Sequence, residues 1–214
     1  MAAKQLKLCG INNIKTIEHI LSHPNPANFL GFIFYNKSSR YISLDKAKSF
    51  NQLNFNKSKK IAVTVDAKFT EIEQIIKNLN PDFIQLHGNE NIEYCSKIKQ
   101  EFDIKIIKAI QVENISDIEQ AKQYHPYTEY ILFDSKTSEY GGSGKSFNHD
   151  LLKNHNNKEK FFISGGLNIN NIEKIINNFN LFDICSGIEL QKGVKDNKKI
   201  TEILDYFSKI NAKK

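Results

Sequence analysis

The segments Lys7-Leu8-Cys9-Gly10 and Ile131-Leu132-Phe133-Asp134 decide the fold, because each is a mostly apolar run that ends on a polar or reactive residue. Runs of this kind predict strands over residues 5–9, 29–34, 60–65, 83–87, 105–109, 130–134, 161–164 and 182–186. Most are nearly continuous in Ile, Val, Leu and Phe, which is typical of strands buried on both faces of a parallel sheet. Between them, apolar residues recur three and four positions apart, as in helices, for example over residues 172–179. Asn168 and Asp196 are expected to mark helix starts, with Asp196 as a helix cap. The alternation predicts an α/β protein with a (β/α)8 TIM barrel.

The length and composition predict one soluble domain. The chain has 214 residues, of which 40% are hydrophobic and 25% charged, and a barrel of this type needs about 200 residues or more. We therefore expect residues 1–214 to form a single domain with its active site at the carboxyl-terminal rim of the strands. No stretch approaches the roughly 20 apolar residues of a membrane span, and the amino terminus lacks the layout of a secretory signal. These features predict a cytoplasmic protein without a membrane partner.

The cysteines and the net charge narrow the choice of partner. Cys9, Cys95 and Cys185 are odd in number and widely spaced, which argues against a disulfide framework and a zinc cluster. The net charge of +6 favours an anionic partner. The lysines are spread over the chain, and their few clusters lack interleaved aromatic residues or a nucleic-acid motif. We therefore expect a phosphorylated small molecule, no nucleic acid and no metal, with a monomer favoured over a homodimer.

Three residues with side chains suited to acid/base chemistry each lie at the carboxyl end of a predicted strand. Cys9, His87 and Asp134 close the first, fourth and sixth strands. Side chains alternate faces along a strand, so all three are expected to point into the barrel mouth. Each has an ordinary structural explanation when taken singly, since a buried Cys is often a small hydrophobe and an Asp after a strand often caps a helix. Together they predict an active site in which Cys9 and Asp134 are the acid/base pair.

Glycine-containing loops follow the seventh and eighth strands. Loops at these two places form the usual phosphate site of this fold, because their backbone N–H groups lie close to a helix terminus. We therefore predict a phosphate cradle made by Gly165, Gly166, Ser186 and Gly187, with tight turns as the simpler alternative. The glycine-rich loop over residues 140–146 lacks the spacing of a nucleotide-binding P-loop and is expected to be a mobile cover.

The residues also resemble a known family. The matching segments, in chain order, are KLCGI at 7–11, GFIFY at 31–35 with SSRY at 38–41, QLHG at 85–88, DSK at 134–136, GGSG at 141–144, SGGL at 164–167 and SGIE at 186–189. Taken in this order, they resemble phosphoribosylanthranilate isomerase, a barrel of the tryptophan pathway. The resemblance implies a cofactor-independent Amadori rearrangement of N-(5-phosphoribosyl)anthranilate to a carboxyphenylamino-deoxyribulose phosphate.

The resemblance also implies a role for four residues. Asp134 matches the general acid that protonates the furanose ring oxygen, and Cys9 matches the general base that removes the proton from C2. Arg40 matches an arginine that faces the anthranilate carboxylate, for which a planar guanidinium is well suited. His87 matches a residue that lines the active site.

Cys9 needs help to act as a base, because an unperturbed thiol with a pKa near 8.5 is only about 3% thiolate at pH 7. Lys7, on the same face of the strand, is expected to lower the pKa of Cys9. Three residues depart from the family pattern: Asn12 stands where Thr is usual, Ser39 where Pro is usual, and Cys185 where Ser is frequent. Because the first and eighth strands of a closed barrel are neighbours, Cys185 is expected near Cys9, with both thiols reduced.

Four other functions have to be weighed against this one. The related histidine-pathway isomerase carries a carboxylate at the end of its first strand, where this chain has Cys9. Indole-glycerol-phosphate synthase generally has catalytic lysines and a longer amino-terminal extension, which are not evident here. A phosphate-binding barrel without catalysis, or a basic nucleic-acid binder, would need no acid/base pair. The presence of both Cys9 and Asp134 disfavours these last two.

Overall fold

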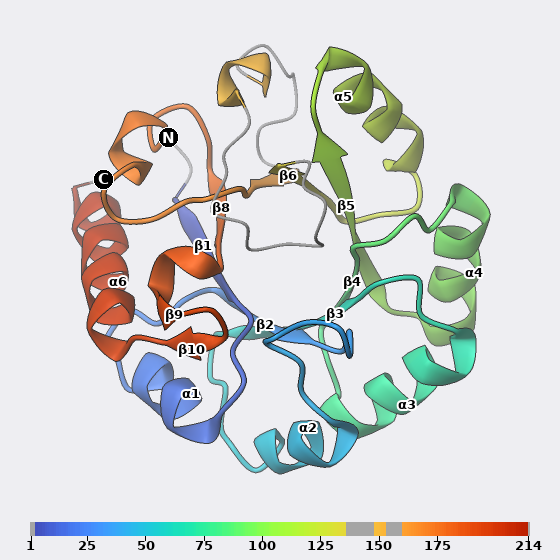
Figure 1. Ribbon diagram of the computed structural model, residues 1–214, viewed down its shortest axis with the longest axis horizontal. Helices are drawn as coiled ribbons and strands as arrows, with labels where there is room; N and C mark the ends of the chain where they lie inside the picture. Colours follow the sequence, from blue (N-terminus) through green and yellow to red (C-terminus); the bar gives the residue numbers. More distant parts are fainter. Residues whose placement is uncertain (1–2, 136–147, 153–159, 214) are drawn as a thin grey trace.

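The computed structural model describes residues 3–135, 148–152 and 160–213. Within them, eight parallel strands close into a barrel in the order β1 to β8 (Figure 1). The strands are β1 Gln5–Cys9, β2 Phe29–Ile33, β3 Lys59–Thr64, β4 Phe83–Leu86, β5 Lys105–Val112, β6 Tyr130–Ser135, β7 Phe161–Ile163 and β8 Leu181–Ile184. The predicted TIM barrel is confirmed. Strand β1 has its predicted bounds, whereas the other strands differ from the predicted ranges at one or both ends; β5, for example, runs three residues further.

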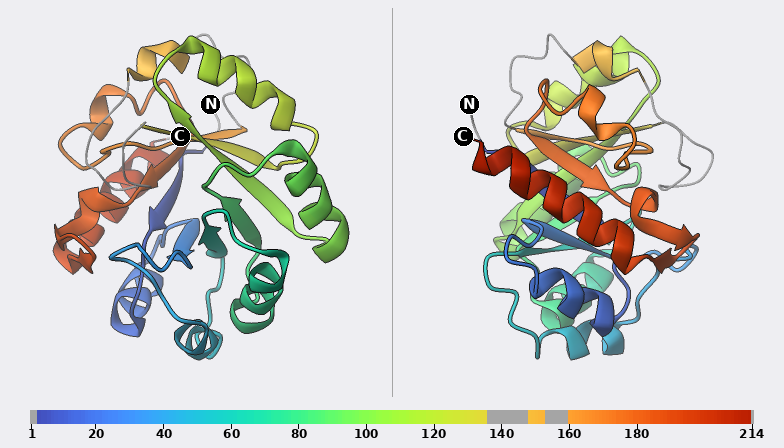
Figure 2. Two further views of the ribbon diagram at one scale, coloured as in Figure 1. Left: turned by 45° about the vertical axis from the view of Figure 1, so that its right-hand side comes forward. Right: turned by 90° about the vertical axis from the view of Figure 1, so that its left-hand side faces the viewer.

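The helices form an outer ring around the barrel (Figure 1). They are α1 Ile14–Leu21, α2 Leu44–Phe50, α3 Phe69–Leu79, α4 Ile92–Phe102, α5 Ile115–Ala121 and α6 Asn197–Ala212, with short 3-10 helices η1 Lys122–Tyr124, η2 His149–Leu152, η3 Ile172–Lys174 and η4 Ser186–Ile188. The two ends of the chain lie side by side in both views of Figure 2. There the Lys4 backbone N–H donates to Asn211 Oδ1, and the Asn211 amide donates back to the Lys4 carbonyl, each at 2.9 Å. Among the described helices, none is long and apolar enough to cross a membrane.

Local sequence explains where α1 and α6 begin. The Asn13 side chain accepts a hydrogen bond from the Thr16 backbone N–H and caps α1. Asp196 caps α6 in the same way, because its carboxylate accepts from the backbone N–H groups of Lys198 and Lys199. Such caps satisfy N–H groups that the first helical turn leaves without partners. The prediction that Asp196 is a helix cap is confirmed.

The segment after β7 was predicted incorrectly. Apolar spacing over residues 172–179 predicts an α-helix that starts near Asn168, but the structure has only η3 and turns there. The Asn168 side chain accepts from the Asn170 backbone N–H, and the Asn171 side chain accepts from the Asn168 backbone N–H. Asparagine side chains that bond to nearby backbone favour turns over helix, which explains the difference.

A short hairpin that the sequence pattern does not predict follows η4. Strand β9 spans Glu189–Gln191, pairs with β10 Val194–Lys195 in antiparallel fashion and lies at the mouth side of the barrel (Figure 1). Three- and two-residue strands are too short to show an alternating pattern. The hairpin matters for the site, because it carries Glu189 and Lys195.

The amino-terminal half of the barrel interior is closed by aromatic rings, here called the aromatic floor. It consists of Phe29 in β2, Phe83 in β4, Tyr130 in β6 and Phe162 in β7. The ring centroids are 5.2 to 6.3 Å apart, mostly with edge-to-face or tilted geometry. Pairs of this kind add about 0.5–1.5 kcal/mol each beyond the burial of their area. The floor therefore packs one half of the barrel, and the opposite half is left for chemistry.

Candidate active site

A cavity at the carboxyl ends of the strands joins residues that lie far apart in the sequence. Its polar and reactive lining includes Cys9, Arg40, Gln85, His87, Asp134, Ser164, Asp183 and Cys185. We call Cys9, His87, Asp134, Asp183 and Cys185 the polar mouth. The structure thus brings together Cys9, His87 and Asp134, which were predicted to meet at the rim, and Arg40, which the family resemblance implied. Asp183 and Gln85 were not among the predicted site residues.

The barrel register explains how Lys7 and Asp183 come together. Lys7 in β1 is the Cα partner of Asp183 in β8, and their side chains form an ion pair with Nζ 3.0 Å from Oδ2, both buried. Gly31 in β2 makes room, because a Cβ there would lie 2.8 Å from the Cys9 sulfur and 3.3 Å from Lys7 Cε. A charged residue inside an apolar run, as at Lys7 and Asp183, is the signal that could have revealed this pair from sequence.

The environment of Cys9 corrects one expectation. Lys7 does attract the Cys9 thiolate, as predicted. However, a hydrogen bond with Cys185 and then burial raise the pKa of Cys9 well above the ordinary thiol value, and Lys7 only partly opposes the rise. The predicted contribution of Lys7 is therefore present, but it does not lower the pKa of Cys9 overall. Sequence spacing identified the attractive charge but not the second thiol, whose effect is larger.

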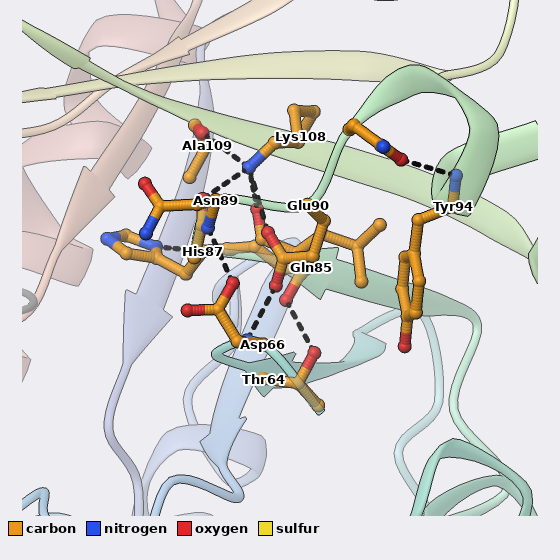
Figure 3. Close-up of polar contacts among 12 residues, drawn as sticks. Thr64, Asp66, Gln85, His87, Asn89, Glu90, Tyr94, Lys108 and Ala109 are labelled. Carbon is orange, nitrogen blue, oxygen red and sulfur yellow. Dashed lines mark hydrogen bonds and ion pairs between the residues drawn. The ribbon is translucent and has the colours of Figure 1, made fainter. Parts of the chain in front are cut away.

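Asp134 is held next to His87. Its Oδ1 accepts a hydrogen bond of 2.8 Å from the Ser135 backbone N–H, and its Oδ2 lies 3.4 Å from His87 Nε2. On the other side of the ring, His87 Nδ1 lies 2.7 Å from Gln85 Nε2 (Figure 3). With the amide nitrogen as donor to Nδ1, the proton of a neutral His87 is on Nε2 and faces Asp134. His87 is therefore placed to orient the Asp134 carboxyl group.

A buried ion pair behind β4 supports the loop that carries His87. Lys108 Nζ lies 2.9 Å from Glu90 Oε2 and also donates to the carbonyl oxygens of Leu86 and Gly88, on either side of His87 (Figure 3). Glu90 Oε1 accepts from the Asp66 backbone N–H, so the same clamp reaches the end of β3. Lys108 stands between Ile107 and Ala109, and such a lone charge in an apolar strand is again the available sequence signal.

Arg40 is anchored by the β9–β10 hairpin. Its Nε and Nη2 atoms donate to the two carboxylate oxygens of Glu189 at 2.7 and 2.8 Å, and Lys195 Nζ donates to the same carboxylate at 2.9 Å. Burial tends to raise the pKa of Glu189, but these hydrogen bonds and positive charges hold it below its usual value. Glu189 engages two of the five guanidinium N–H donors, and Arg40 also lines the cavity.

The glycine loops after β7 and β8 pack directly against each other. Gly165 and Gly166 have φ values of +94° and +65°, a region in which glycine is favoured. The Asn171 amide donates to the Gly166 carbonyl at 2.9 Å and holds this turn. A Cβ on Gly187 would meet the carbonyl oxygen of Leu167, so only glycine permits this approach. The structure therefore brings Gly165, Gly166, Ser186 and Gly187 into two adjoining loops at the mouth end of the barrel.

Two predictions cannot be compared with geometry. The predicted mobile cover at 140–146 and the family segment 141–144 lie outside the described residues. In the part of the chain that is described, no three His, Cys, Asp or Glu side chains are grouped so that they could hold a metal ion.

The fold and the site define a class of protein, a (β/α)8-barrel enzyme with a thiol and a carboxyl group at its mouth and a glycine-rich loop pair beside them. The family model for N-(5'-phosphoribosyl)anthranilate isomerase matches residues 6–206. This chain belongs to that family.

Individual relatives agree with the assignment. The N-(5'-phosphoribosyl)anthranilate isomerase of Rhizobium johnstonii is 34% identical over 213 residues, which cover 97% of this chain and 95% of the relative. The crystal structure of phosphoribosyl anthranilate isomerase from Thermotoga maritima is 33% identical, with a TM-score of 0.84 over 96% of this chain and 99% of that one. A further isomerase structure, 28% identical with a TM-score of 0.82 and the same coverage, contains reduced 1-(o-carboxyphenylamino)-1-deoxyribulose 5-phosphate.

One more structure bears on oligomeric state. It is described as monomers generated from the dimeric Thermotoga maritima isomerase, and it is 29% identical to this chain with a TM-score of 0.80 over 96% of this chain and 98% of that one.

Proposed function

We propose that this chain isomerises N-(5'-phosphoribosyl)anthranilate to 1-(2-carboxyphenylamino)-1-deoxyribulose 5-phosphate in tryptophan biosynthesis. The observation that carries the proposal is the joint placement of Cys9, Asp134 and Arg40 around one cavity in a barrel of this family. A carboxyl group and a thiol are the acid and base that an aldose-to-ketose rearrangement requires. Arg40 adds a site for the anthranilate carboxylate.

The reaction begins at Asp134, which acts as the general acid. It gives its proton to the furanose ring oxygen, and the C1–O bond breaks to leave a protonated Schiff base. Cys9, as thiolate, then takes the proton from C2. The C2–H electron pair forms a C1=C2 double bond while the C1=N pair moves onto nitrogen, and the resulting enolamine relaxes to the ketone when C1 gains a proton and the C2 hydroxyl loses one. His87 lies 3.4 Å from Asp134 and keeps that carboxyl group aimed into the cavity.

The two ends of the substrate are proposed to bind on separate elements. The remaining guanidinium donors of Arg40 receive the anthranilate carboxylate, while Glu189 holds the guanidinium plane in place through its two hydrogen bonds. The phosphate binds to the loops that contain Gly165, Gly166, Ser186 and Gly187. The relative that contains a reduced product analogue supports a phosphorylated ligand of this kind.

A fluorescence assay that follows the loss of phosphoribosylanthranilate tests the function. Wild type, Cys9→Ser and Asp134→Asn are compared, and circular dichroism confirms that each variant is folded. We expect an active wild type and a loss of about 10²–10⁴-fold in kcat for each variant. Cys95→Ala is the matched cysteine control, because Cys95 lies in α4 outside the cavity. An inactive wild type contradicts the proposed function, and an undiminished variant contradicts the role of that residue.

The proposal also covers the oligomeric state of the protein and its location in the cell. We propose a monomer located in the cytoplasm, although the Thermotoga maritima relative is described as dimeric. Leu190, 72% exposed in β9, and Tyr41, 43% exposed, are apolar or aromatic side chains that a dimer could cover. Sedimentation equilibrium over a range of protein concentrations distinguishes the two states.

A further inference from the structure

Cys185 lies beside Cys9 because of the register between β1 and β8. Lys7 pairs with Asp183 and Leu8 with Ile184, and Cys9 and Cys185 are the residues that follow this last pair. Cys9 is the last residue of β1, and Cys185 comes directly after the end of β8. Both thiols line the cavity and form a hydrogen bond with each other. The reaction as written above uses only one of these two sulfur atoms.

The surroundings of Cys185 favour a negative charge. Lys195 Nζ lies 3.9 Å from the Cys185 sulfur, and it is held there by hydrogen bonds to the Cys185 carbonyl oxygen at 2.8 Å and to Glu189 at 2.9 Å. Arg40 is the second cation, because its charge also attracts the Cys185 thiolate. Its side chain passes close to this sulfur, since a Cβ on Gly10 would lie 2.6 Å from Arg40 Cδ and 3.3 Å from the sulfur. Asp183 and Glu189 carry the opposing charges: Lys7 pairs with Asp183, and Glu189 accepts hydrogen bonds from both Arg40 and Lys195. Two cations and one carboxylate therefore leave a net positive charge beside this sulfur.

The pKa values agree with this geometry. The hydrogen bond from Cys9, together with the attraction of Lys195 and Arg40, outweighs burial and Asp183 and lowers the pKa of Cys185 to about 6. The same hydrogen bond and burial raise the pKa of Cys9. These opposite directions, together with the Lys195 ammonium 3.9 Å from the Cys185 sulfur, favour the proton of the pair on Cys9 and the negative charge on Cys185. Cys9 must lose this proton before it can act as a general base, so a nearby group has to accept it.

We propose that Cys185 is the positioning residue that supplies this place: it takes the Cys9 proton through their hydrogen bond, and Cys9 becomes the thiolate that removes the C2 proton. The inference rests on the proposed function and extends it. The transfer conserves charge, because Cys9-SH and the Cys185 thiolate become the Cys9 thiolate and Cys185-SH. The C2 proton then resides on Cys9. The pair gains one proton and Asp134 has given one to the ring oxygen, so exchange with water restores both.

The first experiment locates the charge in the free protein. Thiolate absorbance is titrated in wild type, Cys185→Ala, Cys9→Ser and Cys9→Ala, and iodoacetamide alkylation near pH 7 is mapped by peptide mass spectrometry. We expect one thiolate in wild type with a midpoint near pH 6, no such thiolate in Cys185→Ala, and alkylation at Cys185. Cys9→Ser keeps a hydroxyl donor and preserves the midpoint, whereas Cys9→Ala raises it. Alkylation at Cys9, or an unchanged titration in Cys185→Ala, overturns the proposal.

The second experiment measures the pH dependence of kcat/KM for phosphoribosylanthranilate in wild type, Cys185→Ser and Cys185→Ala. We expect the acid limb of the profile to move from near pH 6 toward the ordinary thiol pKa of about 8.5 in both variants. At pH 7 the thiolate fraction then falls about 30-fold, and kcat falls with it, while KM changes little and most activity returns near pH 9. A merely structural role would lower activity at every pH.

The controls separate this inference from the proposed function. Cys95→Ala should retain the wild-type profile, and folding of each variant is checked by circular dichroism. An active wild type whose acid limb stays in place in both Cys185 variants overturns the role of Cys185 and leaves the isomerase assignment intact. An inactive wild type overturns the assignment, and the location of the charge is still decided by titration and alkylation.

Discussion

The two halves of the barrel interior differ in what they bury. The aromatic floor fills the amino-terminal half with Phe29, Phe83, Tyr130 and Phe162, whose rings contact one another. The polar mouth buries charged and titratable groups in the other half. Within the described part of the chain, His87 Nε2 and one oxygen of Asp183 are buried there without a hydrogen-bond partner. Buried polar groups without full hydrogen bonding cost stability. The aromatic floor therefore stabilises the fold by packing. The polar mouth holds the reactive groups of the active site at a cost in stability.

Replacing the acid should separate the two halves most clearly. In Asp134→Asn the carboxyl proton donor is lost, and we expect kcat to fall about 10²–10⁴-fold while the melting temperature changes little. The measurement is the fluorescence assay combined with thermal unfolding. A large loss of stability with retained activity would place Asp134 among the structural residues instead.

Truncating the floor should give the reverse pattern. Phe162 is fully buried and contacts Phe29 and Tyr130 at 5.2 and 5.3 Å between ring centroids. Phe162→Ala is expected to lower the free energy of unfolding by about 3–5 kcal/mol, while kcat of the folded fraction stays close to wild type. Urea denaturation and the assay at low temperature measure both quantities. Phe162→Leu is the matched control, with a smaller loss expected because it leaves a smaller cavity.

The Lys7–Asp183 ion pair lies between the two halves and should affect both. Lys7→Met leaves the Asp183 carboxylate buried without its partner, at an expected cost of about 3 kcal/mol, and the double variant with Asp183→Asn recovers part of it. The pKa of Cys9 should also rise further, because the attraction of Lys7 no longer opposes the rise. Denaturation curves and thiolate absorbance provide the two readouts. An unmoved Cys9 titration would show that Lys7 does not act on the thiol.

The smallest expected effect is the change in stability over one pH unit, which the polar mouth should produce through Cys185. The pKa of Cys185 is about 6 in the folded protein and 9.0 in the unfolded reference, so between these values the unfolded chain binds more protons. Stability should therefore rise from pH 6 to pH 9, with a slope below the one-proton limit of about 1.4 kcal/mol per pH unit. Thermal unfolding of wild type and Cys185→Ala measures the difference. An equal slope in both proteins would contradict the low pKa.

Parts of the fold could be predicted from sequence because their signals are local. The β1 strand was predicted with its observed bounds, and the cap at Asp196 was recognised, since apolar runs and helix caps depend on neighbouring residues. The α-helix predicted after β7 is not observed, because a different local effect outweighs the apolar pattern there. Its apolar spacing is helical, but the asparagines at 168 and 171 bind the backbone and favour turns.

The candidate site likewise has some residues that the sequence predicts and others that it does not. Cys9, His87 and Asp134 could be predicted to meet because residues at the ends of parallel strands share one rim. Glu189 and Lys195, which hold Arg40 and face Cys185, could not be assigned a role, because the hairpin that carries them is too short to leave a pattern. The only sequence signal of the Lys108–Glu90 ion pair was the charged Lys108 within an apolar strand.

By itself the sequence determined the barrel, the end at which its chemistry lies and the thiol and carboxyl group that were predicted to perform it. Strand periodicity and residue type are sufficient for those conclusions, because they depend on short stretches of chain. Only the tertiary structure decided the protonation state of Cys9. The pKa of a buried thiol depends on which charges and hydrogen bonds surround it, and closure of β8 onto β1 brings Cys185, with Lys195 and Arg40, to that place.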